Sequence, residues 1–214
     1  EEEKTNYVAD LLNYLDDTIH LLTDFKVNDN YRSALYDNIA ILQIMYIQQD
    51  LISELFQIFQ IKSDQKDNTI RFLRNELIGH PISRSLNKKR ELLSSVFITR
   101  GTRGTSLEYI RYHKNNGYKF DLKAYEWPKL FAIHEKYLLE QFSLLLNRID
   151  EILISFKSAL LHLLDKIDSY PTIELIEAVE GIYEQYHKNC HPYSIDNIRY
   201  NISKLGSHQR YELT

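Results

Sequence analysis

Cysteine, glycine and proline are scarce in this chain, and each scarcity narrows the class of protein. The single cysteine, Cys190, cannot form an internal disulfide, so nothing in the sequence requires an oxidising compartment. Only 6 glycines and 4 prolines interrupt 214 residues, which favours long helices. No apolar run approaches the ~20 residues that span a bilayer, and the first ten residues are acidic where a signal peptide would be basic and then apolar. We therefore expect a cytoplasmic, mainly helical protein that does not enter a membrane.

Apolar residues recur at the helical period over most of the chain. The pattern predicts helices over residues 6–24 and 31–59, and a third that begins near Ser63. Gly79 is predicted to end this third helix in the left-handed conformation, with Pro81 preventing its continuation. The longest helix is predicted after Trp127, and its two lines of apolar residues seven apart indicate a bundle core or a dimer seam. Shorter helices are predicted at 171–186 and, weakly, at 194–206.

The segment between Ser94 and Asp121 differs from the rest of the chain in composition. It combines β-branched and aromatic residues with the turn signals RGTRGT and NNG, which predicts a small antiparallel hairpin or three-stranded flap. The whole chain is then mainly α: an up-down bundle of four to five long helices with a small antiparallel β-hairpin insertion. We expect one helical domain over residues 1–170, with the flap at about 94–121, and a helical extension over 171–214 that packs on the same domain.

Positive charge is concentrated in the middle of the chain. Residues 71–119 contain 11 Lys and Arg against 3 Glu, a net charge of +8, which leaves −12 for the remainder of a chain whose total is −4. Such a segment attracts phosphate, although it could equally be a solvated loop or a patch that pairs with the acidic helices. If it binds RNA, the expected contacts to the nucleic-acid backbone are Arg71, Arg84, Lys88, Lys89, Arg90, Arg100 and Arg103.

Three polar residues flank the predicted end of the third helix: Arg74, Asn75 and His80. Their spacing, an arginine followed by a polar residue and then by a histidine, resembles the motif of the HEPN family. That resemblance implies a helical domain that commonly dimerises and, in active members, a metal-independent ribonuclease without cofactors. It also implies a toxin-antitoxin or phage-defence role, with an antitoxin protein as a partner.

The chemistry of the three residues fits RNA cleavage. In cleavage without metal the ribose 2′-OH attacks the adjacent phosphate, so a base must take its proton while charge builds on the phosphoryl oxygens. His80 is suited to proton transfer, Arg74 offers a planar fork of donors to a phosphate, and Asn75 could orient either group. On a continuous helix, however, Arg74 and His80 lie about 120° apart in azimuth and ~9 Å apart along the axis. Either Gly79 breaks the helix, or a second chain completes the site across a two-fold axis, which the resemblance favours.

A purely structural role for the same residues is the alternative. His80 could interact with the helix dipole, and Arg74 could pair with Asp67, Glu76 or an acidic helix, in a non-catalytic interaction or scaffold protein. No metal site is expected. The cluster of His187, Cys190 and His191 lacks a fourth ligand for zinc.

Overall fold

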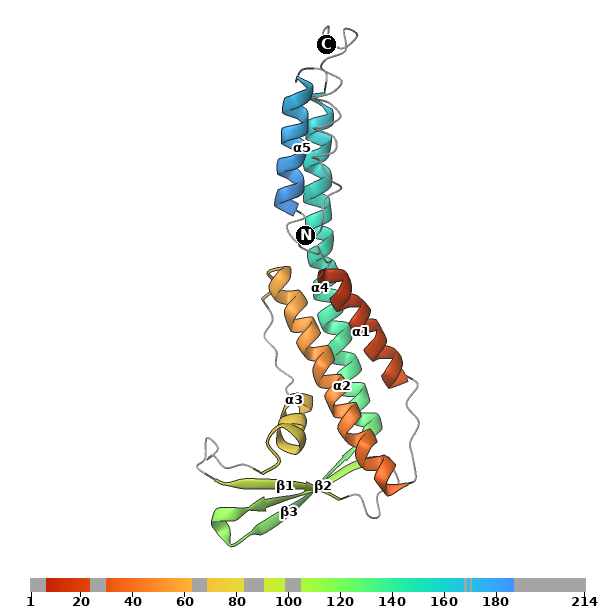
Figure 1. Ribbon diagram of the computed structural model, residues 1–214, viewed down its shortest axis with the longest axis vertical. Coiled ribbons are helices and arrows are strands. Elements are labelled where there is room, and N and C mark those ends of the chain that lie inside the picture. The colour runs from red at the N-terminus through yellow and green to blue at the C-terminus, as the bar shows by residue number, and fades with distance from the viewer. Residues whose placement is uncertain are drawn as a thin grey trace, which may run out of the picture. The chain divides into compact units, whose positions relative to one another are not determined.

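The computed structural model describes residues 7–23, 30–62, 69–82, 91–98, 105–167, 169 and 171–186. Helices account for most of these residues, and one small sheet lies between the third and fourth α-helices along the chain (Figure 1). The predicted class, mainly helical with a small antiparallel sheet, is therefore confirmed. In chain order the elements are α1 (Tyr7–Thr23), α2 (Tyr31–Ile58), α3 (Thr69–Arg74), the π-helical turn η1 (Asn75–Gly79), β1 (Leu93–Phe97), β2 (Ser106–His113), the 3-10 turn η2 (Lys114–Asn116), β3 (Lys119–Glu126), α4 (Trp127–Leu164) and α5 (Thr172–Tyr186).

Three helices begin and end close to the predicted residues, and the longest helix begins at Trp127, close to its predicted start. In these helices, α1, α2, α5 and α4, the amphipathic pattern and the scarcity of helix-breaking residues both favour a helix. The third helix differs, because its described α-helical part has only six residues and continues as the π turn η1. Its predicted start near Ser63 and the weak helix at 194–206 lie outside the described residues. No helix in the described part of the chain has an apolar stretch long enough to cross a membrane.

The sheet is a three-stranded antiparallel meander in the order β1-β2-β3. Ile110 at its centre pairs with Val96 on one side and with Leu122 on the other. Between β2 and β3, Gly117 adopts a φ of 63°, a left-handed conformation that glycine tolerates without steric cost. The predicted flap is thus confirmed as three strands, and β3 runs five residues beyond the predicted end at Asp121, directly into α4.

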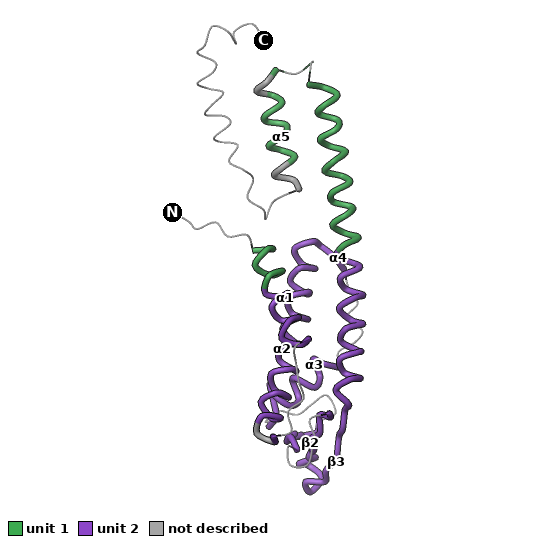
Figure 2. Tube along the Cα trace, turned by 90° about the vertical axis from the view of Figure 1, so that its right-hand side faces the viewer, with its two compact units in different colours: residues 1–13, 146–214 green, residues 14–145 purple. Residues whose placement is uncertain are grey.

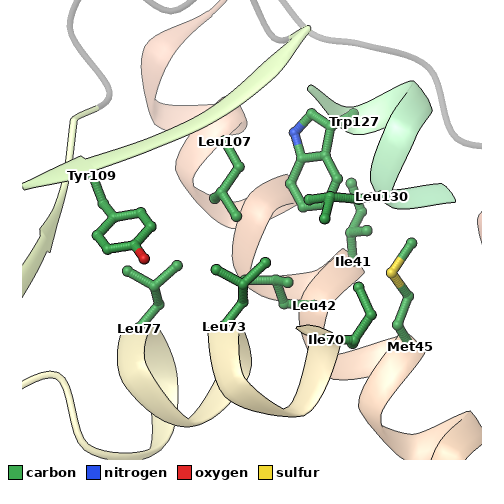
Figure 3. Close-up of a cluster of buried hydrophobic side chains, with 10 residues drawn as sticks. All are labelled: Ile41, Leu42, Met45, Ile70, Leu73, Leu77, Leu107, Tyr109, Trp127 and Leu130. Carbon is green, nitrogen blue, oxygen red and sulfur yellow. The ribbon is translucent and has the colours of Figure 1, made fainter. Parts of the chain in front are cut away.

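The main core lies where the sheet, α3, α2 and the start of α4 meet. Figure 3 shows side chains from all four elements pointing into one cluster. Trp127, the only tryptophan, is 2% exposed, and its indole Nε1 donates a hydrogen bond to Asn38 Oδ1 at 3.1 Å. The cluster consists of Ile41, Leu42 and Met45 from α2, Ile70, Leu73 and Leu77 from α3 and η1, Leu107 and Tyr109 from β2, and Trp127 and Leu130 from α4.

The chain divides into two compact units, coloured separately in Figure 2. One contains residues 14–145, and so holds the sheet, α2, α3 and the main core. The other contains residues 1–13 and 146–214, and so holds the second half of α4 together with α5, which runs beside it (Figures 1 and 2). The Arg74–His80 motif belongs wholly to the first of these units.

Candidate functional site

The motif residues lie on a helix whose last turn is wider than an α-helical turn. Ile70, Leu73 and Leu77 are buried against the core and fix the side of the helix that faces inward (Figure 3). After Arg74 the hydrogen-bond pattern changes, and the backbone N–H of His80 donates to the carbonyl oxygen of Asn75 at 2.7 Å. Single π turns of this kind are rare and occur often at functional sites.

Arg74 is held by α2 and by its own neighbour. Its Nε donates to Gln43 Oε1 at 3.2 Å, and its Nη1 donates to Asn75 Oδ1 at 3.1 Å. The guanidinium carbon lies 4.3 Å from the centre of the Tyr46 ring, a cation–π distance. No carboxylate of the described residues pairs with Arg74, and two of its five N–H donors are used in these hydrogen bonds. The guanidinium is therefore oriented while its charge is not neutralised by an acid within this part of the chain.

Gly79 gives this guanidinium room. A Cβ placed on Gly79 would lie 2.9 Å from Arg74 Nη1 and 3.5 Å from Asn75 Oδ1, so both polar groups reach the residue directly before His80. The predicted left-handed conformation of Gly79 is wrong, because Gly117 is the glycine with a positive φ in the described part of the chain. Close approach of a side chain, and not backbone conformation, makes a small residue suitable here. His80 itself is exposed, with φ −139° and ψ 55°.

Glu76 ties the same turn to the sheet. Its two carboxylate oxygens accept hydrogen bonds from Nε and Nη2 of Arg111, from the Tyr109 hydroxyl at 3.0 Å and from Ser95 Oγ at 2.9 Å. The side chains of Glu76 and Arg111 are 10% and 18% exposed, so this two-pronged ion pair is well shielded from water. Burial, and then the nearby Glu76 carboxylate, raise the pKa of the Tyr109 hydroxyl. The hydrogen bonds that Arg111 donates to Glu76 raise the pKa of Arg111.

The motif is thus fixed on two sides, by α2 through Arg74 and by the sheet through Glu76. Of the partners considered for Arg74 in a structural role, Glu76 is bound to Arg111 instead, and Asp67 lies outside the described residues. Sequence reasoning missed Tyr46 and Arg111. Both lie on other elements, and no local pattern in the sequence distinguishes them from the remaining tyrosines and arginines.

Only one of the predicted RNA-contacting residues lies in the described part of the chain. Arg71 forms an ion pair with Asp50 of α2, and its guanidinium carbon lies 4.9 Å from the centre of the Tyr46 ring. The guanidinium groups of Arg71 and Arg74 therefore both lie close to the Tyr46 ring. Among the described residues, an acid pairs with Arg71 but not with Arg74. The other predicted contacts, Arg84, Lys88, Lys89, Arg90, Arg100 and Arg103, lie outside the described residues, as do His187, Cys190 and His191.

A second polar cluster lies inside the helical core. His134 Nε2 and Gln48 Oε1 are 2.6 Å apart, and Gln48 Nε2 donates to Thr18 Oγ1 at 3.2 Å, so the cluster links α4, α2 and α1. Burial lowers the pKa of His134 to about 4, which keeps the imidazole neutral at pH 7. His134 Nδ1 and the Tyr137 hydroxyl have no hydrogen-bond partner among the described residues. These groups are sealed from solvent, so His134 is a core histidine and not a reactive one.

A pocket of about 450 Å³ lies near the junction of β3 and α4. Tyr125, Lys129 and Ile133 line it, together with Thr69 at the start of α3. Arg74, Asn75 and His80 do not line this pocket. In the part of the chain that the structure describes, no group of three His, Cys, Asp or Glu side chains is arranged to hold a metal ion.

Comparison of the chain with models of known protein families, with curated proteins and with solved structures finds no match. The candidate site therefore depends on its own geometry: an oriented guanidinium on Tyr46, an amide beside it, and an exposed imidazole one residue beyond the glycine that the guanidinium contacts.

Proposed function

We propose that this chain binds and cleaves single-stranded RNA without a metal ion, at the turn that carries Arg74, Asn75 and His80. The observation that carries the proposal is the contact between the Arg74 guanidinium and Gly79, which brings a fixed cation to the residue before an exposed histidine. The Arg74 guanidinium is held in place, and no carboxylate of the described residues pairs with it. Such a group is suited to a phosphate, because its forked N–H donors match phosphate oxygens. This arrangement supports the expected division of roles between Arg74 and His80.

The reaction would proceed by internal transfer. The ribose 2′-OH attacks the neighbouring phosphorus, the bond from phosphorus to the 5′-oxygen breaks, and a 2′,3′-cyclic phosphate forms. His80 accepts the proton of the 2′-OH, and the 5′-oxygen leaves with a proton from imidazolium or water. Arg74 donates hydrogen bonds to the non-bridging phosphoryl oxygens, where negative charge increases in the transition state. Asn75 Oδ1 keeps Arg74 Nη1 in place during the reaction.

The resemblance to the HEPN family adds the finer features of the proposal. These are an up-down helical bundle, a homodimer that completes the site, a cytoplasmic setting and an antitoxin protein as a regulator. Lys88, Lys89, Arg90, Arg100 and Arg103 of the basic segment would bind the RNA backbone.

The proposal is tested by RNA cleavage in the presence of a chelator. His80→Ala should abolish cleavage of single-stranded RNA and leave thermal stability nearly unchanged, since an exposed side chain contributes little to packing. His162→Ala, which removes another exposed histidine from α4, is the matched control and should cleave as the wild type does. Full activity of the His80→Ala protein, or cleavage that requires added Mg²⁺, would overturn the proposal.

A non-catalytic interaction protein is the second candidate. It is favoured by the hydrogen bond of Arg74 to α2 and by the ion pair of Glu76 with the sheet. The same contacts would be expected if these residues only held the helix, α2 and the sheet together. Under that function Arg74→Ala lowers the melting temperature, and purified protein has no nuclease activity to lose. The same set of variants therefore separates the two candidates.

A further inference from the structure

The second half of α4 carries an exposed apolar face. At 100° per residue, seven positions between Leu146 and Leu164 fall within about 100° of the helix circumference. Five of the seven are leucine or isoleucine, and these are between 51% and 69% exposed. We name this set the α4 leucine face; it consists of Leu146, Asp150, Leu153, Ile154, Lys157, Leu161 and Leu164.

This face is distinct from the two lines of apolar residues, seven apart, that were predicted from the sequence; one of these lines contains Phe142, Ile149, Phe156 and Leu163. Ile149, Phe156 and Leu163 of that line are partly buried, and they lie roughly 110° around the helix from the centre of the leucine face. α5 runs beside this half of the helix (Figures 1 and 2). One apolar side of α4 is therefore partly covered within its own unit, whereas the leucine face is turned to solvent. Isolated exposed leucines are ordinary, but five on one side of one helix mark an interaction surface.

Six of the seven residues of the leucine face are arranged symmetrically about one point of the helix. This midpoint lies between Leu153 and Ile154. Asp150 and Lys157 each lie about 5 Å from that midpoint along the axis, on opposite sides. Leu146 and Leu161 each lie about 11 Å from it. Six of the seven residues therefore form three mirror pairs, two of them apolar and one of opposite charge. Leu164 has no counterpart in the face, because its mirror position is occupied by Ser143.

We infer that the α4 leucine face binds the same face of a second copy of this chain, with the two helices antiparallel about a two-fold axis at the midpoint. In this arrangement Asp150 faces the partner's Lys157 twice, once on each side of the axis, and Leu146 faces the partner's Leu161. A parallel pair would instead place Asp150 against the partner's Asp150 and Lys157 against the partner's Lys157. Neither Asp150 nor Lys157 has an ion pair within the described residues, so both charges are available to the partner. A two-fold interface needs this kind of self-complementarity.

The area of the face is sufficient for specific association. From their exposed fractions, the five apolar side chains would remove roughly 500 Å² per copy from water, or about 1,000 Å² for the pair, the lower end for a specific interface. An interface of that size predicts a dimer that forms at micromolar concentration and dissociates on dilution. The inference is independent of the proposed nuclease activity, and its test uses no RNA.

Sedimentation equilibrium of the full chain under reducing conditions, over a range of micromolar concentrations, tests the pairing. The wild type should associate to a dimer, and Asp150→Lys or Lys157→Asp should each weaken the dimer by about tenfold or more, because each places like charges opposite each other twice. Glu151→Lys is the matched control. It makes the same change of charge one residue away, outside the face, and should associate as the wild type does.

Combination of the two substitutions decides the orientation. The protein with both Asp150→Lys and Lys157→Asp should recover the wild-type dimer, since opposite charges again face each other across an antiparallel pair. Leu153→Glu should give a monomer, whereas Ser155→Glu on the opposite side of the helix should not. The inference is overturned by a wild type that stays monomeric, as it would if other residues of this chain cover the face. It is equally overturned by a dimer that survives Leu153→Glu, or by a double variant that fails to recover the dimer.

Discussion

Glu76→Gln removes the negative charge that joins the motif turn to the sheet. The carboxylate accepts two hydrogen bonds from Arg111, one from Tyr109 and one from Ser95, and both members of the ion pair are largely shielded from water. Loss of one partner leaves the Arg111 guanidinium shielded and unpaired, which costs about 3–5 kcal/mol. Because the glutamine amide still offers one acceptor oxygen, we expect a loss of about 3 kcal/mol in the free energy of unfolding.

The ion pair between Arg71 and Asp50 is the internal comparison. Its side chains are 25% and 49% exposed, and a solvated pair of this kind contributes about 0–1 kcal/mol. Asp50→Asn should therefore cost less than about 1 kcal/mol, although it too removes the carboxylate of an arginine ion pair. The two ion pairs differ both in shielding from water and in the number of hydrogen bonds to the carboxylate, and both differences predict the larger loss for Glu76→Gln.

Urea unfolding followed by tryptophan fluorescence measures both effects in the correct part of the molecule. Trp127 is the only tryptophan and is buried in the core that contains the motif turn, so its signal reports the unfolding of that core. Glu76→Gln should lower the midpoint by about 1–2 M urea. Adding Arg111→Met to Glu76→Gln should recover part of the loss, because it removes the unpaired guanidinium. Equal and small losses for Glu76→Gln and Asp50→Asn would refute the reasoning.

Three further predictions concern pH, the glycine and salt. Burial lowers the pKa of His134 in the folded state to about 4 from 6.5. The contribution of the neutral imidazole to the free energy of unfolding is therefore complete above pH 6.5 and is lost as the pH falls to about 4. The loss should be about 3 kcal/mol by Trp127 fluorescence, and a His134→Gln protein with the same dependence would contradict it. Gly79→Ala displaces Arg74 Nη1, so RNA cleavage should fall about tenfold or more, while the melting temperature changes little. Gly181→Ala is the control and should leave cleavage unchanged, because an added Cβ there meets no atom within 4 Å. Equal cleavage by the two variants would contradict this prediction. RNA affinity should fall steeply with salt, less so after replacement by alanine of Lys88, Lys89, Arg90, Arg100 and Arg103; an affinity that salt does not change would exclude contact with the backbone.

Elements that depend on local pattern could be predicted from the sequence. The periodicity of apolar residues places α1, α2, α4 and α5, and the turn signal at Gly117 places the hairpin between β2 and β3. In each case the residues that decide the structure are neighbours in the chain.

Features that depend on distant contacts could not be predicted in this way. A glycine two residues before a proline suggests a left-handed helix cap. At position 79, however, a small residue is needed because the Arg74 guanidinium lies against it. Glu76 lies 35 residues from Arg111, and no local signal pairs them. The leucines of α4 are visible in the sequence, but which of them are exposed depends on which side of the helix its neighbours cover.

The most direct test of the central claim uses an oligodeoxynucleotide that contains a single ribonucleotide, incubated with the protein in chelator. Attack by a ribose 2′-OH requires that ribose, so the wild type should cut only on the 3′ side of it and leave a 2′,3′-cyclic phosphate, and His80→Ala should leave the strand intact. Three results would contradict the assignment of this turn as a ribonuclease site. The wild type could leave both this strand and single-stranded RNA uncut, it could cut at deoxynucleotides, or His80→Ala could give the same product as the wild type.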